Sequence, residues 1–162
     1  MTSKKLILCL HGWRTNSHVI RLQCEDVFEH AGNAFEVHYL DAPHEAQGAA
    51  FEAVDLAFPS AKKHGWKEWY NYNASEEGGS DTYEGLETSI AFVESEVKRL
   101  KPYALCGFSQ GGTLVSLIAK RYQDKGEHCG EKLLMFRANS KWSFRMMTFK
   151  RLGSSSFLGN LI

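Results

Sequence analysis

The sequence lacks long hydrophobic runs and any excess of charge of one sign. The apolar run near the N-terminus, Leu6 to Leu10, has only five residues, whereas a membrane-spanning helix needs about 20 and a secretory signal about 7 to 15. We therefore expect no membrane span and no secretory leader. Because 19 basic residues balance 19 acidic ones, no overall field draws the chain to phosphates, and nucleic acid is not an expected partner.

Cysteine is scarce, and its spacing contains no Cys-x-x-Cys pair. The four residues are Cys9, Cys24, Cys106 and Cys129, and two of them lie in apolar, strand-like runs. This pattern is typical of buried, reduced thiols, which persist in the cytosol and the nucleus, where we expect the protein. The sequence gives no reason to expect a metal site or a cofactor.

Strands and helices alternate along the chain. Hydrophobic residues make up 43% of it, enough for the core of a globular domain. Short apolar runs predict strands at residues 5–10, 35–40, 103–108 and 132–136, and helical spacing predicts helices at residues 17–31, 84–100 and 110–122. The alternation favours an α/β fold with a mostly parallel sheet and flanking helices.

A long segment without a sustained period, residues 45–81, interrupts this alternation. It is rich in aromatic side chains, among them Trp66 and Trp69. Loops of this length in compact domains are usually functional, and ligand sites are lined by such rings. We expect Trp66 and Trp69 to wall an apolar pocket; a surface loop packed by its own rings is the alternative.

The most informative motif is Gly-x-Ser-x-Gly at residues 107–111. It follows a predicted strand and precedes a predicted helix, which is the context of a nucleophile elbow. Gly107 and Gly111 give strand and helix room to approach, and Ser109 then stands on a strained turn at the carboxyl edge of the sheet. The backbone N–H of Gln110 would face a developing oxyanion. The alternative is an ordinary strand-to-helix turn.

A second N–H for the oxyanion is expected from the loop after the first strand. His11, Gly12 and Trp13 occupy that place. Gly12 lets the backbone turn toward Ser109, so the N–H of Trp13, or that of Gly12, would meet the substrate oxygen. A plain turn with a structural glycine and a packed histidine is the alternative.

The sequence resembles the FSH family of small serine hydrolases in four blocks, which occur in the family's order. They are LCLHGWRTN at 8–16, LDAPH at 40–44, YEGLETS at 83–89 and GFSQGG at 107–112. The resemblance implies an α/β-hydrolase fold and carboxylesterase or thioesterase chemistry on a small acyl ester or thioester. It also implies that Ser109 is the nucleophile and that residues 11–13 supply the oxyanion hole.

The family pattern further implies a late aspartate and a late histidine, and there the sequence departs from it. After Ser109 the only histidine is His128, and the only acids are Asp124, Glu127 and Glu131. A helix over residues 110–122 carries the chain about 18 Å away from the elbow. His128 therefore begins at the wrong end of the helix to act as the base.

Two earlier histidines are alternative bases, because a triad is defined by geometry and not by order. His11 and His44 both follow predicted strands at the carboxyl edge, where Ser109 is expected. Either side chain could approach the serine. His11 is equally suited to a structural role in its turn, and His44 to shaping the rim of the pocket.

The end of the chain has a different composition. Residues 132–162 contain six basic residues and no acid, interleaved with aromatic ones. Such a tail can bind nucleic acid or anionic membrane, but the abrupt change favours a continuation by an alternative exon or a shifted reading frame. We expect an incomplete hydrolase domain at residues 1–136, missing the last strands, and a divergent tail at residues 137–162.

An incomplete sheet has structural consequences. We expect only four strands, with an open edge at the strand of residues 132–136 that favours self-association. Apolar side chains such as Leu117, Leu133 and Met135 should then be more exposed than core residues usually are.

Two functions are compatible with these observations. The first is a serine hydrolase that cleaves esters or thioesters through an acyl-enzyme at Ser109. The second is a catalytically incomplete, hydrolase-like protein or binding module, because loss of one triad member costs several orders of magnitude in rate.

Overall fold

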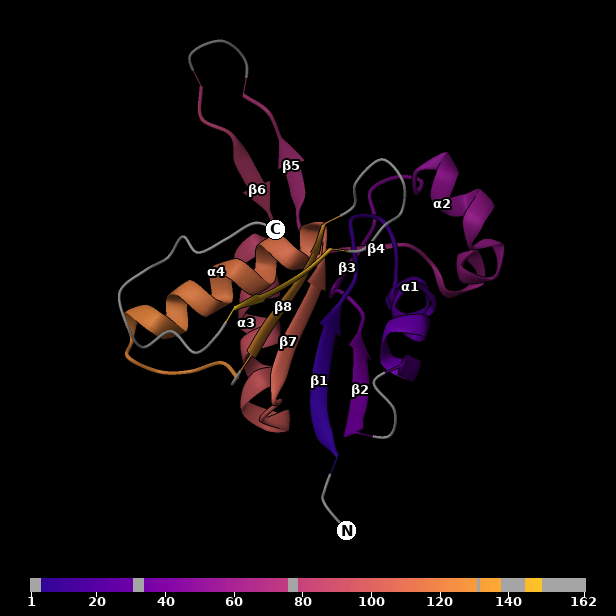
Figure 1. Cartoon of the computed structure of the whole chain (residues 1–162). Helices are drawn as coiled ribbons and strands as arrows, with labels where there is room; N and C mark the ends of the chain where they lie inside the picture. The colour runs from indigo at the N-terminus through magenta and orange to yellow at the C-terminus, as the bar shows by residue number, and fades with distance from the viewer. Residues whose placement is uncertain (1–3, 31–33, 76–78, 131, 138–144, 150–162) are drawn as a thin grey trace.

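The chain forms one five-stranded sheet flanked by helices (Figure 1). The computed structural model describes residues 4–30, 34–75, 79–130, 132–137 and 145–149. The strand order is β2 (Phe35–Leu40), β1 (Lys5–Leu10), β7 (Ala104–Phe108), β8 (Lys132–Arg137) and β9 (Arg145–Phe149). The first four strands are parallel, and β9 pairs antiparallel with β8. The predicted α/β class is confirmed.

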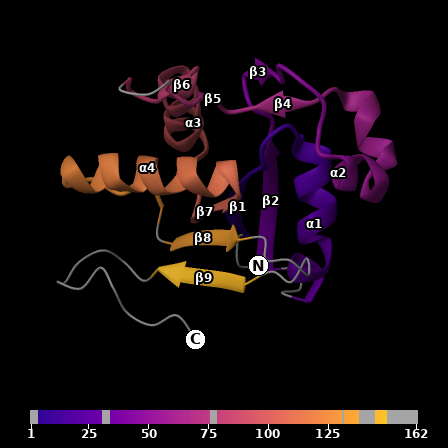
Figure 2. The same ribbon diagram turned by 90° about the horizontal axis from the view of Figure 1, so that it is seen from above.

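Alternate residues of the central strands face two separate layers of helices (Figure 2). On one face, Leu8 and Leu10 of β1 pack in a cluster with α3 (Leu86–Leu100) and α4 (Gln110–Asp124). On the other face, Ile7 and Cys9 pack in a cluster with α1 (Ser17–His30). Because both faces are covered, the strand is apolar from Leu6 to Leu10, which is the pattern that predicted it.

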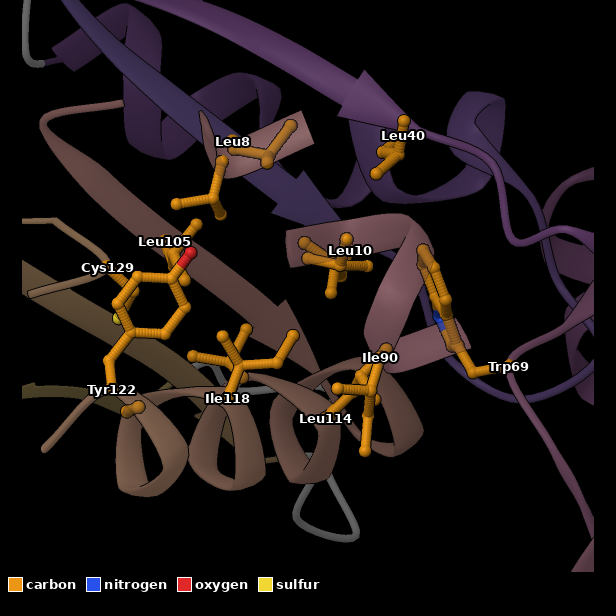
Figure 3. Packing of buried hydrophobic residues seen from close by; sticks show 14 of the residues in the cluster. Leu8, Leu10, Leu40, Trp69, Ile90, Leu105, Leu114, Ile118, Tyr122 and Cys129 are labelled. Carbon is orange, nitrogen blue, oxygen red and sulfur yellow. The ribbon is translucent and has the colours of Figure 1, made fainter. Parts of the chain in front are cut away.

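The larger cluster forms the main core (Figure 3). Figure 3 shows its side chains in a row that begins at Tyr122 and Cys129 and ends at Trp69. Tyr122 lies in the last turn of α4, whereas Trp69 lies in the aromatic segment between the first and second predicted helices. The core therefore ties that segment to the carboxyl end of the sheet.

The segment of residues 45–81 contains regular structure that its sequence did not predict. It includes α2 (Glu52–Ala57), the 3-10 helix η2 (Pro59–His64), the pair β3 (His44–Glu45) and β4 (Lys67–Glu68), and the hairpin β5 (Asn71–Asn73) and β6 (Thr82–Glu84). Elements of two to six residues are too short to set a hydrophobic period. The β5–β6 hairpin projects away from the sheet (Figure 1).

The prediction of only four strands was wrong. β9 is a fifth strand, and its pairing with β8 runs from Leu133↔Phe149 to Arg137↔Arg145. Backbone hydrogen bonding needs no side-chain pattern, so the edge of β8 is covered although the tail shows no strand alternation. Residues 138–144 and 150–162 lie outside the described residues, and the domain boundary after residue 136 stays a prediction.

Leu117 has the exposure that was predicted, at 37%. The side chains of Leu133 and Met135, like residue Glu131, lie outside the part of the structure that is described. Among the described residues, no helix combines the length and hydropathy needed to cross a membrane.

A close approach of backbones joins α4 to the sheet. A Cβ atom on Gly111 would overlap the carbonyl oxygens of Leu10 and His11, whereas one on Gly112 would lie 3.2 Å from the carbonyl oxygen of Gly107. The first contact leaves no room for any side chain. The second requires a shift of only a few tenths of an ångström.

We therefore expect Gly111→Ala to lower the free energy of unfolding by at least about 2 kcal/mol, because rigid backbone atoms must move. Gly112→Ala is the matched control, and its small steric cost is offset by the better helix propensity of alanine. Urea denaturation of both variants measures the difference. Equal stability of the two would contradict the backbone contact.

Candidate active site

Ser109 lies at the sharp junction of β7 and α4. Ser109 is the exposed N-cap residue of α4. Its backbone dihedral angles are φ 51° and ψ −117°. A positive φ is strained for a serine and persists only where the surroundings enforce it. The predicted strained backbone is present, and Ser109 directly follows the carboxyl end of β7 (Ala104–Phe108), a fully buried strand.

Gly12 brings the loop after β1 against Ser109. A Cβ atom on Gly12 would lie 3.6 Å from the Cβ of Ser109 and 3.0 Å from Cδ1 of Phe108. Only a residue without a side chain fits there comfortably. The sequence predicted that Gly12 lies next to Ser109, and the structure confirms this.

Among the described residues, two backbone N–H groups of the loops around Ser109 donate to no backbone acceptor. Gln110 is the first residue of α4, where an N–H has no partner within the helix. Within the described part of the chain, the N–H of Trp13 donates to no backbone carbonyl. These are the two donors that the sequence assigned to an oxyanion, and that role stays a prediction.

His11 is fully buried and both of its ring nitrogens are engaged. Nδ1 lies 2.7 Å from the carbonyl oxygen of Gly12, and Nε2 accepts the backbone N–H of Ala42 at 3.0 Å. The imidazole is therefore neutral with its proton on Nδ1. Burial lowers its pKa to about 4. His11 joins the loops after β1 and β2, and it has no free nitrogen with which to act as a base for Ser109.

The side chain of Gln110 fastens the aromatic segment to the elbow. Its Oε1 accepts the backbone N–H of Trp69 at 2.9 Å, and its Nε2 donates to the carbonyl oxygen of Tyr70 at 2.7 Å. The indole of Trp69 in turn donates to the carbonyl oxygen of His11 at 2.9 Å, and the hydroxyl of Ser89 donates to the carbonyl oxygen of Trp69. This side-chain role had no signal in the sequence, because it joins residues about 40 positions apart.

Trp69 is a core residue, with none of its surface exposed. Trp66 packs with a separate small cluster that contains Val54 and Ala61. The expectation that Trp66 and Trp69 wall an apolar pocket stays a prediction. Beside the loop after β1, Phe51 is 62% exposed and packs edge-on against Trp13, with 5.1 Å between the ring centroids.

An ion pair between Arg14 and the buried Glu68 stabilises the loop that follows β1. Arg14 has a positive φ of 48°, and its Nε donates to Oε2 of Glu68 at 3.3 Å. Oε1 of Glu68 accepts the backbone N–H of Gln47 at 3.1 Å. The guanidinium also lies 4.2 Å from the centre of the Trp13 ring. Each partner of the buried Glu68 comes from a different loop, so this carboxylate connects them.

His44 is not directed at the serine. Its Nε2 lies 3.1 Å from the carbonyl oxygen of Gly85, at the start of α3. His18 and His64 stack on each other, and His30 bonds to its own helix. Among the described residues, no imidazole forms a hydrogen bond with Ser109.

The late residues lie far from the elbow. His128 lines a cavity with Lys4 and Pro102, at the amino edge of the sheet. Asp124 forms an ion pair with Lys120 on the exposed side of α4. The expectation that His128 starts at the wrong end is confirmed.

Strand order, flanking helices and elbow together define an α/β-hydrolase-like fold. The crystal structure of the esterase PE8 has this fold: it matches 84% of this chain and 69% of its own with a TM-score of 0.56, at 15% identity. The family model for serine hydrolases named FSH1 matches residues 1–149. The chain therefore belongs to the FSH1 serine hydrolase family.

Named relatives of the chain are hydrolases and esterases. The hydrolase FUB4 of Fusarium oxysporum f. sp. lycopersici is 32% identical over 72% of this chain and 39% of its own length. The esterase OVCA2 of Danio rerio is 27% identical over 75% of this chain and 58% of its own. The esterase CG5412 of Drosophila melanogaster is 31% identical over 73% of this chain and 42% of its own length. The chain thus spans about two fifths to three fifths of the length of these relatives.

The buried, neutral His11 predicts a loss of stability in acid. Its pKa is about 4 in the folded protein against an ordinary value of 6.5, so the unfolded chain binds one more proton between these pH values. The contribution of His11 to the free energy of unfolding is fully present above pH 6.5. It falls by up to about 3 kcal/mol as the pH drops to about 4. We expect His11→Gln to lack this part of the pH dependence.

Urea unfolding between about pH 7.5 and pH 4.5 measures this slope. His30→Gln, at an exposed position on α1, is the control and should keep the slope of the parent protein. A parent-like slope in His11→Gln would show that another group is responsible.

Gln110→Ala should destabilise the protein by about 2 kcal/mol, because it leaves the buried N–H of Trp69 without an acceptor. Gln123→Ala, at an exposed position on the same helix, should change the stability by less than about 0.5 kcal/mol. Denaturant unfolding compares the two. An equally small loss of stability in Gln110→Ala would contradict a stabilising role for the hydrogen bonds between its side chain and residues 69 and 70.

Proposed function

We propose that Ser109 is the nucleophile of a hydrolase that acts on esters or thioesters through an acyl-enzyme. The observation that carries this proposal is the strained backbone of Ser109, at the start of α4 and beside Gly12. Ser109 Oγ attacks the acyl carbon, and the carbonyl electron pair moves onto the oxygen. The N–H groups of Gln110 and Trp13 bind the oxyanion. The alcohol or thiol leaves, and water then hydrolyses the acyl group.

An apolar acyl group suits the surroundings of this serine. Trp13 and the largely exposed Phe51 form an aromatic pair next to Gly12. An apolar chain that covers Phe51 removes exposed aromatic surface from water, which favours its binding. We therefore assign the substrate class as esters or thioesters of an apolar acid.

The proton of Ser109 has no imidazole to receive it among the described residues. His11 is neutral and doubly bonded, and His44 bonds to Gly85. In this chain the proton therefore passes to water, a weak base, and acylation is slow. An oxyanion hole without a working triad still retains a rate of about 10³–10⁴ over water.

The second candidate is a hydrolase-like binding module, which the same lack of an imidazole favours. Free imidazole separates the two, because it can replace a missing base only where the serine attacks. We expect hydrolysis of p-nitrophenyl butyrate by the chain to exceed that of Ser109→Ala at least ten-fold, with a further increase on addition of imidazole, because the unused donors stabilise the oxyanion.

The rate of Ser109→Ala in the same imidazole concentration is subtracted, since imidazole itself cleaves such esters. Ser95→Ala, an exposed serine on α3, is the matched control and should behave as the parent. Mass spectrometry should show one acyl group on the peptide that contains Ser109. Equal rates in the parent and Ser109→Ala, with and without imidazole, would leave only the binding module.

A further inference from the structure

A cavity of about 1090 Å³ lies at the amino edge of the sheet, at the lower ends of β1 and β7 in Figure 1. It is formed by the start of β1, the end of α3, the residues before β7 and the chain after α4. Ser109 follows β7 at the opposite edge, six residues and about 20 Å from Tyr103 in the cavity wall. The cavity is therefore separate from the proposed active site.

Among the described residues that line this cavity, the charged side chains are all basic. They are Lys4, Lys5, Lys98 and Lys101, and His128 adds a further nitrogen donor. Lys98 and Lys101 also suit the negative end of the α3 dipole. Lys4, Lys5 and His128 come from other parts of the chain, so the dipole of one helix does not account for the cluster.

These lysines lack the acidic partners that most other lysines have. Of the nine lysines whose side chains are described, four form ion pairs with carboxylates, namely Lys62, Lys67, Lys120 and Lys125. Four of the remaining five line the cavity, and the fifth is Lys63. Like charges gathered without counter-charges repel one another, and a bound anion relieves that repulsion.

The rest of the wall is apolar and aromatic. Leu6, Leu100, Pro102 and Tyr103 contribute to it, and Nζ of Lys5 lies 4.3 Å from the centre of the Tyr103 ring. A cavity of this volume is larger than an inorganic phosphate requires and is in the range of small-molecule sites. The wall thus suits a ligand with several phosphate charges and one flat or apolar part.

We propose that this cavity binds a phosphorylated small molecule of the nucleotide type, with its phosphates on Lys98, Lys101 and Lys4 and its flat part against the wall near Tyr103. Lysine is a usual phosphate ligand, as a point charge with three donors. The concave shape, with lysines contributed by separate segments of the chain, favours a small molecule over a flat lipid surface. This site is independent of the reaction at Ser109.

Isothermal titration with inorganic tripolyphosphate, and then with adenosine triphosphate, tests the proposal at a fixed ionic strength of about 0.1 M. We expect saturable binding of both, with the nucleotide tighter because of its base. Lys98→Gln and Lys101→Gln should each weaken binding roughly five- to ten-fold, as expected for a lost charge-assisted contact. The amide NMR signals of residues 128–130 should shift.

Lys63→Gln is the matched control, since it removes an unpaired lysine outside the cavity. It should leave the affinity unchanged, and Ser109→Ala should do so as well. Absence of saturable binding, equal weakening by Lys63→Gln, or a nucleotide that binds more weakly than tripolyphosphate would overturn the proposal. Binding to anionic phospholipid vesicles without binding of either soluble probe would overturn it in favour of a membrane surface.

Discussion

The contact between the backbone of α4 and the end of β1 is the constraint on which the site depends. Gly111 lies against the carbonyl oxygens of Leu10 and His11, with no space for a side chain. Because the helix begins so close to the strand, the turn that precedes it must be sharp, and Ser109 takes a positive φ. The same approach brings the loop after β1, with Gly12, to the serine.

Polar side chains of the interior then hold this arrangement in place. His11 connects the loops after β1 and β2 through its two nitrogens, and Gln110 connects the elbow to Trp69 and Tyr70. Each of these buried polar groups has partners, so the low dielectric of the core strengthens the bonds. The neutrality of His11 follows from the same burial, and it is why this histidine stabilises the fold and takes no part in proton transfer.

The two edges of the sheet have different chemistry. The carboxyl edge holds the strained Ser109 and, on the loop after β1, the aromatic pair of Trp13 with Phe51. The amino edge holds a cluster of lysines without acidic partners, which suits phosphate. Both arise from the parallel order of the strands, because that order gathers all strand starts at one edge and all strand ends at the other. Balanced charge over the whole chain conceals this difference.

The sequence by itself determined the four parallel strands, the three long helices and the turn at Ser109. Gly-x-Ser-x-Gly and the apolar runs are local patterns whose physical cause lies within a few residues. The tertiary structure alone decided the fifth strand and the short elements of residues 45–81. It decided the hydrogen bonds of the Gln110 side chain and the ion pair of Arg14 with Glu68. It also decided that His11 is fully bonded and that the unpaired lysines share one cavity. These features join residues that are far apart in the chain, and only folding brings such residues within hydrogen-bonding distance.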